Sequence, residues 1–223
     1  MYQELVLNND PKSIISETIR TLRTNLQFAS VDKKIKTILI TSSVPGEGKS
    51  FIAANLACAF AQSGSRVLLV DCDIRKGRQH YIFNSHNKSG LSNLLLENVK
   101  EKYMDYIQET KVKNLSVMFR GVTPPNPSEL LGSSKNKELI EILRNEYDIV
   151  IFDSAPINGG LTDSIIMSTL VDGVVVVSSY KETPISLLNN TKKSLQNVNA
   201  NILGVVLNRA SSKSKKYYGH YYG

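Results

Sequence analysis

The sequence predicts an α/β fold in which helices cover a doubly wound, mostly parallel sheet. Three observations predict it: near-continuous apolar segments, helix patterns between them, and a glycine-rich turn that joins the first segment to the next helix. Apolar runs without alternation are typical of strands buried on both faces, as in a parallel sheet. Their alternation with helices gives the β-α-β rhythm of a doubly wound fold.

Each expected strand is a short run rich in Ile, Leu and Val. None shows the in-out alternation of a strand with one exposed face, and residues 202–208 (ILGVVLN) are an example. The strands should therefore be covered by helices on both sides. The expected strands are residues 36–42, 66–71, 148–153, 173–178 and 202–208, with residues 115–119 as a sixth candidate.

The helix patterns carry start and stop signals. Gly64 follows one of them and is typical of a helix end. Thr183 and Pro184 open another, as a cap followed by proline at the first helical position. The earliest helix is amphipathic and precedes a short polar link, residues 30–34. The expected helices are residues 12–29, 49–63, 134–146, 162–170 and 184–198.

At 223 residues the chain is long enough for one well-buried domain and too short for two comfortable ones. We expect an N-terminal segment at residues 1–34, the domain at residues 35–210, and a disordered tail at residues 211–223. Residues 209–223 hold four basic residues and no acidic one. This region is expected to meet an anionic membrane surface or an acidic partner, or simply to be solvated.

The composition argues against several classes of protein. No apolar run approaches the roughly 18–20 residues that cross a bilayer, and the first residues lack a secretion signal. We therefore expect a cytoplasmic protein in which Cys58 and Cys72 are reduced thiols. The net charge of +7 falls to +3 without the basic end, so no nucleic-acid partner is expected.

The segment between the first strand and the next helix predicts a phosphate-binding loop. Residues 43–50 read SVPGEGKS and fit the pattern G-x-x-x-x-G-K-[ST], except that Ser43 replaces the first glycine. Glycines let backbone N–H groups turn toward phosphate oxygens, and the following helix adds its positive end. Lys49 would bridge the β- and γ-phosphates, and the Ser50 hydroxyl would bind Mg²⁺. The competing interpretation is an ordinary glycine turn. The expected nucleotide contacts are Val44, Pro45, Gly46, Glu47, Gly48, Lys49, Ser50 and Phe51.

Acidic residues follow two other expected strands. Asp71 and Asp73 stand two apart where one strand ends, and Asp153 ends another. Because ligands of a parallel sheet collect at the carboxyl ends of its strands, these carboxylates are expected near the loop. Asp71 and Asp73 would hold Mg²⁺ or accept a proton, and Asp153 would bind Mg²⁺ directly or through water. The competing interpretation is turn residues that leave a strand.

Together these motifs resemble those of a known family, the bacterial tyrosine kinases that regulate capsule and exopolysaccharide synthesis. Residues 41–50, 67–75 and 149–156 are similar to its three nucleotide motifs, and residues 121–131 to a distinctive loop. Without the family, that loop is a proline-stiffened connection. The resemblance covers nearly the whole chain. It implies a P-loop NTPase fold like that of MinD and ParA proteins, with ATP and Mg²⁺ as cofactors and tyrosine as the phosphate acceptor.

In this interpretation the site residues divide the work of phosphoryl transfer. Asp73 would accept the proton of the tyrosine hydroxyl, and Arg75 would help to hold phosphate or acceptor. Asn208 and Arg209 would line the nucleobase side, because they end the last strand. The expected catalytic residues are Lys49, Asp71, Asp73 and Asp153, and the expected metal ligands are Ser50, Asp71 and Asp153.

Two outer segments also match the family. Glu17, Arg20 and Arg23 form its E-x-x-R-x-x-R pattern, which lies between neighbouring subunits of a ring. The competing interpretation is a solvated helix face with one ion pair. Four of the ten tyrosines lie in the last seven residues, where the family has an autophosphorylation site that enters a neighbour's active site. A sticky tail or an aromatic binding patch is the alternative. These tyrosines are Tyr217, Tyr218, Tyr221 and Tyr222.

The resemblance implies several partners. They are other copies of the chain in a ring, for which an octamer is the candidate size, a separate transmembrane activator, a cognate tyrosine phosphatase and other protein substrates. The activator would recruit the chain to the inner face of the membrane. Each phosphate adds about −1.5 to −2 charges, so phosphorylation of the tail is expected to loosen the ring.

Three departures from the family pattern affect the expected rate more than the chemistry. Gly77 stands where proline is common, residues 154–156 replace Thr-Pro-Pro, and residues 158–160 are looser.

Two other functions stay open. One is a ParA- or MinD-like ATPase, although the extra lysine of that loop is absent here. The other is a non-catalytic regulator, in which ATP locks an assembly that controls polysaccharide polymerisation.

Overall fold

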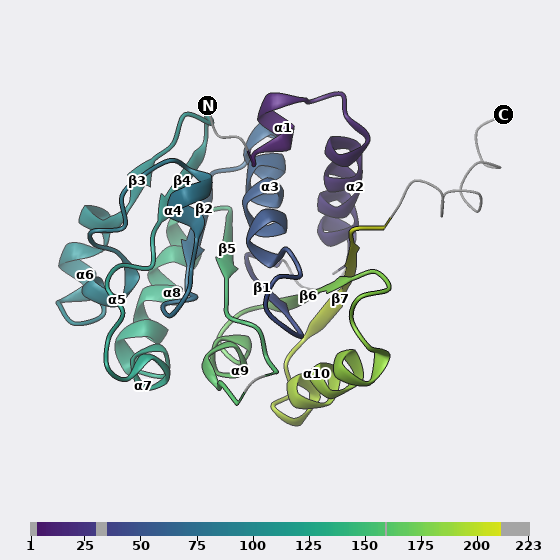
Figure 1. Cartoon of the computed structure of the whole chain (residues 1–223). Helices are drawn as coiled ribbons and strands as arrows, with labels where there is room; N and C mark the ends of the chain where they lie inside the picture. The colour runs from purple at the N-terminus through teal and green to yellow at the C-terminus, as the bar shows by residue number, and fades with distance from the viewer. Residues whose placement is uncertain (1–3, 30–34, 159, 211–223) are drawn as a thin grey trace, which may run out of the picture.

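The computed structural model describes residues 4–29, 35–158 and 160–210 and confirms the doubly wound α/β architecture (Figure 1). In these residues seven strands form one sheet in the order β3-β4-β2-β5-β1-β6-β7. Every neighbouring pair is parallel except β3 with β4. The strands are β1 (Thr37–Ser42), β2 (Val67–Asp71), β3 (Gln108–Glu109), β4 (Leu115–Met118), β5 (Ile149–Asp153), β6 (Gly173–Ser179) and β7 (Ile202–Asn208).

The order of the strands brings the acidic motifs together. In the register of β2 with β5, Asp71 lies opposite Asp153, and in the register of β1 with β5, Ile40 lies opposite Asp153. The carboxyl ends of β1, β2 and β5 therefore meet at one edge of the sheet, where ligands of this fold class collect.

Helices cover both faces of the sheet, and the sheet divides the apolar core into two clusters. The largely buried α3 (Lys49–Gln62) crosses one face, with α1 (Val6–Asn9) and α2 (Ile14–Phe28) beside it (Figure 1). A second apolar cluster fills the opposite face. The remaining helical elements are α4 (Gln79–Ile82), α5 (Leu91–Leu94), α6 (Val99–Lys102), the 3-10 helix η1 (Tyr103–Tyr106), α7 (Pro127–Leu131), α8 (Ser134–Glu146), α9 (Asp163–Ser168) and α10 (Ile185–Asn197).

The N-terminal segment is attached to α3 through a buried asparagine. Asn55 donates a hydrogen bond from Nδ2 to the carbonyl of Glu4, 2.9 Å away, and its Oδ1 lies 3.5 Å from the Leu7 nitrogen. The side chains of Leu5 and Leu7 are almost completely buried. Leu5 and Leu7 therefore pack into the core of the domain.

The long elements lie where they were predicted, but the prediction that every strand is buried on both faces is wrong for β7, a strand at the edge of the sheet in which Val205 and Leu207 are exposed. The short elements β3, α1, α4, α5, α6 and η1 were not predicted, because segments of four residues or fewer show no measurable periodicity. It also placed Pro184 inside α10, whereas this residue is extended and precedes the helix. Thr183, the expected cap, instead donates a hydrogen bond from its hydroxyl to the Glu47 carboxylate. Cys58 and Cys72 are free thiols, as predicted.

None of the helices in the described residues is long and apolar enough to cross a membrane. The link at residues 30–34, Gly159 and the tail at residues 211–223 lie outside the described residues. The predictions on the tail tyrosines therefore stay predictions.

Candidate active site

The loop between β1 and α3 has the backbone of a phosphate-binding loop. Gly46 and Gly48 have φ angles of +85° and +91°, in the left-handed region that favours glycine. A Cβ atom at Gly48 would lie 2.2 Å from Nδ2 of Asn208, so the position also has no room for a side chain. Lys49 begins a helix of 14 residues, whose N–H groups and dipole favour an anion at this end.

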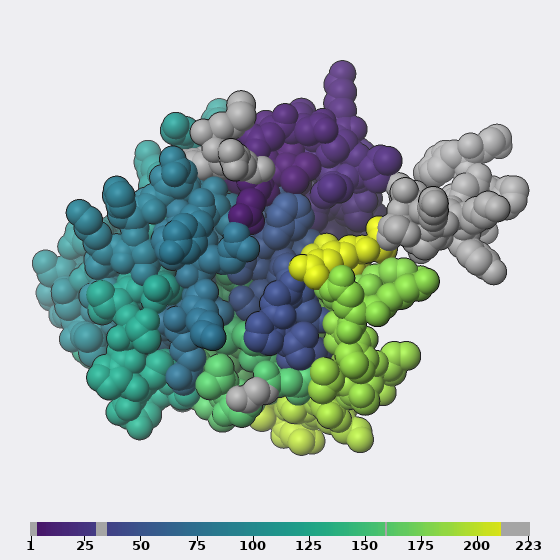
Figure 2. Space-filling view, viewed as in Figure 1, coloured from purple at the N-terminus to yellow at the C-terminus, as the bar shows by residue number. Residues whose placement is uncertain are grey.

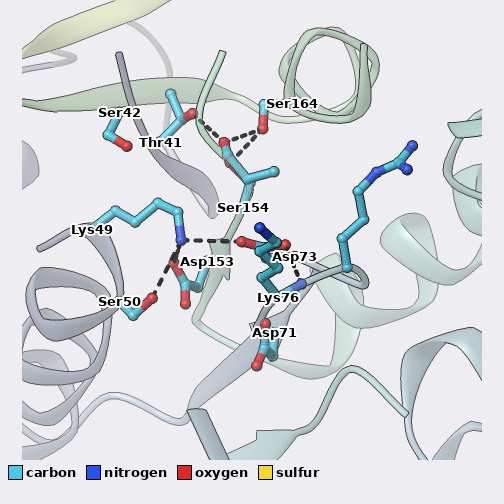
Figure 3. A network of polar contacts seen from close by, with 12 residues as sticks. Thr41, Ser42, Lys49, Ser50, Asp71, Asp73, Lys76, Asp153, Ser154 and Ser164 are labelled. Atoms are coloured by element: carbon cyan, nitrogen blue, oxygen red, sulfur yellow. Dashed lines mark hydrogen bonds and ion pairs between the residues drawn. The ribbon is translucent and has the colours of Figure 1, made fainter. Parts of the chain in front are cut away.

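Lys49 extends from α3 to the carboxylates at the ends of β2 and β5 (Figure 3). Its Nζ lies 3.2 Å from Asp73 Oδ2 and 3.9 Å from Asp153 Oδ1. Burial opposes the charge on Lys49, but Asp153, Asp73 and Asp71 outweigh it and hold the pKa of the ammonium above its usual value. The predicted phosphate-binding lysine is thus charged and, in this state, paired with carboxylates.

Asp71 and Asp153 are completely buried at the same edge. Burial and the neighbouring Asp153 raise the pKa of Asp71 well above its usual value, although the Gln79 N–H opposes the shift. Burial also raises the pKa of Asp153, against the opposing effect of Lys49 and of the Ser50 and Gln79 side chains. Two acidic groups this close favour a cation between or beside them.

The residues present fit a magnesium ion. In the described part of the chain, Oδ1 of Asp71 and Oδ1 of Asp153 are buried and accept no hydrogen bond. A Cβ atom at Gly77 would lie 2.1 Å from Asp71 Oδ1, so glycine keeps the space beside this oxygen open. Across the described residues, no group of three His, Cys, Asp or Glu is placed to hold a metal by itself. Mg²⁺ commonly uses one or two carboxylates together with substrate phosphates and water.

Glu47 holds the phosphate-binding loop in place through hydrogen bonds, a role that was not predicted from the sequence. Its carboxylate is buried and accepts hydrogen bonds from the N–H of Val44 at 2.8 Å, from the N–H of Ser179 at 3.1 Å and from the Thr183 hydroxyl. Phe51, another predicted nucleotide contact, packs against the apolar cluster around α3. Pro45 and Gly46 are exposed at the tip of the loop.

The end of β7 lies against the loop. Asn208 donates from Nδ2 to the carbonyl of Glu47 at 2.9 Å, and Arg209 donates from Nη2 to the carbonyl of Gly46 at 2.8 Å. Arg209 also pairs with Glu182 at 2.5 Å. Figure 2 shows the end of β7, in yellow, against the blue surface that includes the loop. Both residues are therefore next to the nucleotide site, and contact with the base stays a prediction.

Arg75 does not reach the loop in this state. Its Nε lies 2.7 Å from Oδ2 of the buried Asp163, and its Nη2 lies 3.3 Å from the Ser128 hydroxyl. Ser128 in turn donates to Asp163 at 2.5 Å. The segment after β2 is thereby joined to α7 and α9, so residues 121–131 have at least a structural role.

Hydrogen bonds hold residues 154–156, where the chain departs from the family pattern. The Ser154 hydroxyl donates to the carbonyl of Ile40 at 3.1 Å and receives a hydrogen bond from Ser164 at 3.0 Å (Figure 3). The Thr41 hydroxyl donates to the carbonyl of Ala155 at 2.8 Å. These bonds hold the segment after β5 against β1.

The arginines of α2 are both accommodated within the chain. Arg20 forms an exposed ion pair with Glu17 at 2.6 Å, and Arg23 donates to the Ala59 carbonyl at 3.4 Å. The Nε of Arg23 is buried and donates no hydrogen bond within the described residues. Each arginine therefore has a partner within the chain, and the role of the two between subunits stays a prediction.

Sequence comparison places the chain among named kinases. A family model described as an AAA domain matches residues 35–204. The putative tyrosine-protein kinase CapB of Staphylococcus aureus is 41% identical over 98% of this chain and 95% of its own length. The tyrosine-protein kinase YwqD of Bacillus subtilis (strain 168) is 41% identical over 99% of this chain and 92% of its own length.

Structural comparison agrees. The crystal structure of the chimerical protein CapA2B2 has a TM-score of 0.88 and 42% identity, and covers 94% of this chain and 91% of that one. The cell division ATPase MinD of Pyrococcus furiosus has a TM-score of 0.65 and 23% identity, over 77% of this chain and 71% of that one, which shows a common fold alone. The chain therefore belongs to the bacterial tyrosine kinases of capsule and exopolysaccharide synthesis.

Proposed function

We propose that this kinase binds ATP at the loop between β1 and α3 and transfers the γ-phosphate to the C-terminal tyrosines of another copy of the chain. One observation carries the proposal. Lys49 begins the helix after the loop, and its partly buried ammonium lies 3.2 Å from Asp73 and 3.9 Å from Asp153. Phosphoryl transfer needs mainly positioning and neutralisation of charge, which this arrangement can supply.

Lys49 and Asp73 would act in turn. When ATP binds, the Lys49 ammonium moves from the carboxylates to the β- and γ-phosphate oxygens. Asp73 then loses its ion pair and is free to accept the proton of the acceptor tyrosine. The tyrosine oxygen forms a bond to the γ-phosphorus, the bond from that phosphorus to the bridging oxygen breaks, and ADP leaves with that oxygen.

Ser50, Asp71 and Asp153 would hold the magnesium ion that accompanies ATP. A bound magnesium ion supplies positive charge for the phosphate oxygens during transfer. Oδ1 of Asp71 and Oδ1 of Asp153, which are buried and accept no hydrogen bond within the described residues, support this role. Asn208 and Arg209 would border the base, because their side chains are hydrogen-bonded to the loop carbonyls.

The acceptors would be Tyr217, Tyr218, Tyr221 and Tyr222, which form a tyrosine cluster within the last seven residues. Transfer between copies requires an assembly, and we propose a ring in which Glu17, Arg20 and Arg23 of α2 lie at the subunit contact. Glu17 and part of Arg20 are exposed and therefore accessible. The separate transmembrane activator would bring this ring to the inner face of the membrane.

One assay tests the transfer. Purified protein is incubated with Mg²⁺ and γ-labelled ATP, and label on protein and free phosphate are measured. We expect label on tail tyrosine in the parent, and a loss of at least a hundredfold in Lys49→Met. Lys88→Met is the matched control, because Lys88 is exposed and away from the loop. It should label like the parent.

A second variant separates the competing functions. With all four tail tyrosines changed to Phe, the label should disappear while ATP binding persists. Label that persists in Lys49→Met contradicts the proposal. Free phosphate without labelled tyrosine indicates an ATPase, and binding with neither product indicates a non-catalytic regulator.

A further inference from the structure

Gln79 is a completely buried side chain that contacts all three nucleotide motifs, although its sequence context gave no sign of this. It begins α4, eight residues after Asp71. Its Nε2 donates to Asp153 Oδ2 at 2.8 Å and to the carbonyl of Ser50 at 3.1 Å. Its backbone N–H donates to Asp71 Oδ2 at 3.0 Å. One residue thus joins the ends of β2 and β5 to the start of α3.

The orientation of the Gln79 amide follows from its neighbours. A primary amide has two N–H donors and one oxygen acceptor. Both groups that face Nε2, a carboxylate oxygen and a carbonyl oxygen, are acceptors. The reversed amide would set oxygen against oxygen. With Nε2 facing these two acceptors, the Gln79 Oε1 is buried and has no hydrogen-bond partner among the described residues. The amide is therefore held by its donors alone.

This arrangement fixes one oxygen of each carboxylate and leaves the other without a hydrogen bond, although Asp153 Oδ1 lies 3.9 Å from Lys49 Nζ. Oδ2 of Asp71 and Oδ2 of Asp153 each accept a hydrogen bond from Gln79, whereas the two Oδ1 atoms accept none within the described chain. A buried carboxylate oxygen without a partner is unfavourable. Hydrogen bonds from an outer partner commonly orient metal-binding carboxylates and tune their affinity.

We propose that Gln79 is a positioning residue, which holds Asp71 and Asp153 by Oδ2 and so presents their Oδ1 atoms to the magnesium ion of the nucleotide complex. The inference rests on the proposed metal role of these two aspartates. Gln79 itself touches neither nucleotide nor acceptor. Its contribution is therefore to the magnesium-dependent part of nucleotide binding and not to the contacts between the loop and the phosphates.

The test measures binding of fluorescently labelled ADP to the full chain, with Mg²⁺ and with EDTA. The ratio of the two dissociation constants gives the gain in affinity from magnesium. In Gln79→Met, which keeps the length of the side chain without its donors, we expect this gain to fall about tenfold or more. Binding in EDTA should stay within about twofold of the parent, because the loop amides and Lys49 are unchanged.

Gln62→Met is the matched control. Gln62 is exposed near the far end of α3 and donates one hydrogen bond, to the Leu7 carbonyl at 3.4 Å. Its variant should keep the full gain from magnesium. Gln79→Asn provides a second test if Gln79→Met does not fold, because it stays polar but is too short to span the same two acceptors. It too should lose the gain.

Three outcomes decide the matter. A reduced gain with normal binding in EDTA supports the proposal. An unchanged gain in the folded Gln79 variants, or equal weakening with and without magnesium, overturns it and leaves Gln79 a merely structural residue. Asp71→Asn and Asp153→Asn are measured in parallel. If these variants keep the full gain, the proposed metal ligands are wrong, which is a separate failure from that of Gln79.

Discussion

The hydroxyl groups of Ser43 and Thr191 form a hydrogen bond 2.9 Å long between the start of the phosphate loop and α10. Both residues are completely buried. Asn158 also donates to the Thr191 hydroxyl, at 3.0 Å, so the segment after β5 joins the same contact. The general loop pattern has glycine where Ser43 stands. The serine therefore gives this loop a side-chain anchor that glycine cannot provide.

Ser43→Gly should restore the general loop pattern and nevertheless destabilise the protein. We expect the free energy of unfolding to fall by about 1 kcal/mol, because a buried hydrogen bond is lost and the unfolded chain gains freedom. Thr191→Val should have a similar effect, and the double variant should lose less than the sum, since both changes remove the same bond. Urea denaturation measures all three.

Thr169→Val is the control for these variants. Thr169 is exposed, and its hydroxyl bonds only to the nearby Ile166 carbonyl. It should change stability by at most about 0.5 kcal/mol. Strict additivity of Ser43→Gly and Thr191→Val would show that the two hydroxyls do not stabilise the fold through each other.

Gly77→Ala should disturb the metal site rather than the loop. The added Cβ would lie 2.1 Å from Asp71 Oδ1, so the carboxylate must move. We expect the gain in ADP affinity from magnesium to fall about tenfold and the free energy of unfolding to fall by about 1–3 kcal/mol. The same ADP titrations and a urea denaturation measure both effects.

Gly204→Ala is the matched control, because a Cβ at this position would meet nothing within 4 Å. Magnesium-dependent binding that survives in Gly77→Ala would mean that the carboxylate position seen here is not the one that magnesium needs.

The outline of the site could be predicted because it depends on local patterns and one general rule. The glycines and Lys49 are contiguous, and Asp71 and Asp153 each end an apolar run. Parallel strands gather their carboxyl ends, so these separate motifs had to meet. Asp71 and Asp153 do lie opposite each other in the sheet.

The supporting residues could not be predicted, because each acts on a partner far away in the sequence. Gln79 and Asp153 are 74 residues apart, Arg75 and Asp163 are 88 apart, and Thr191 and Ser43 are 148 apart. A buried Gln or Thr has no distinctive local pattern. Only the packing of α4, α9 and α10 against the sheet defines what these side chains contact.

Asp163→Asn should loosen the connection between the segment after β2 and residues 121–131. Asp163 is 1% exposed and accepts charged hydrogen bonds from Arg75 at 2.7 and 3.2 Å. Loss of its charge should lower the free energy of unfolding by about 1–3 kcal/mol. Hydrogen exchange should also rise in α7, because Ser128 shares the same carboxylate. Mass spectrometry of peptides from residues 121–131 measures this exchange.

Glu138→Gln is the control, because its ion pair with Lys100 is largely exposed. Such pairs contribute at most about 1 kcal/mol. Unchanged exchange in α7 of Asp163→Asn would show that the Arg75 network does not hold this segment in place.

Asp172→Asn tests a charge at the opposite edge of the sheet, and its effect should depend on pH. Asp172 Oδ2 accepts three hydrogen bonds of 2.9 Å, from the N–H groups of Lys36 and Thr37 and from the Thr37 hydroxyl. Its Oδ1 lies 3.0 Å from Arg144 Nη1. Burial acts to raise the pKa of Asp172, but these bonds and Arg144 outweigh it, and the net pKa is below the usual 3.8.

A pKa that is lower in the folded state means that the folded protein binds the proton less tightly than the unfolded chain. The ionised Asp172 therefore stabilises the fold fully above about pH 4, and this stabilisation disappears as the pH falls through the lower, folded pKa. At pH 7 the free energy of unfolding of Asp172→Asn should be about 1–3 kcal/mol lower than that of the parent. The difference should shrink steadily below about pH 4, as measured by urea denaturation at a series of pH values.

Asp105→Asn, an exposed change with a lysine 3.9 Å away, should differ from the parent by at most about 0.5 kcal/mol at pH 7. A gap for Asp172→Asn that stays constant down to pH 2 would mean that the carboxylate stabilises the fold by its shape and not by its charge.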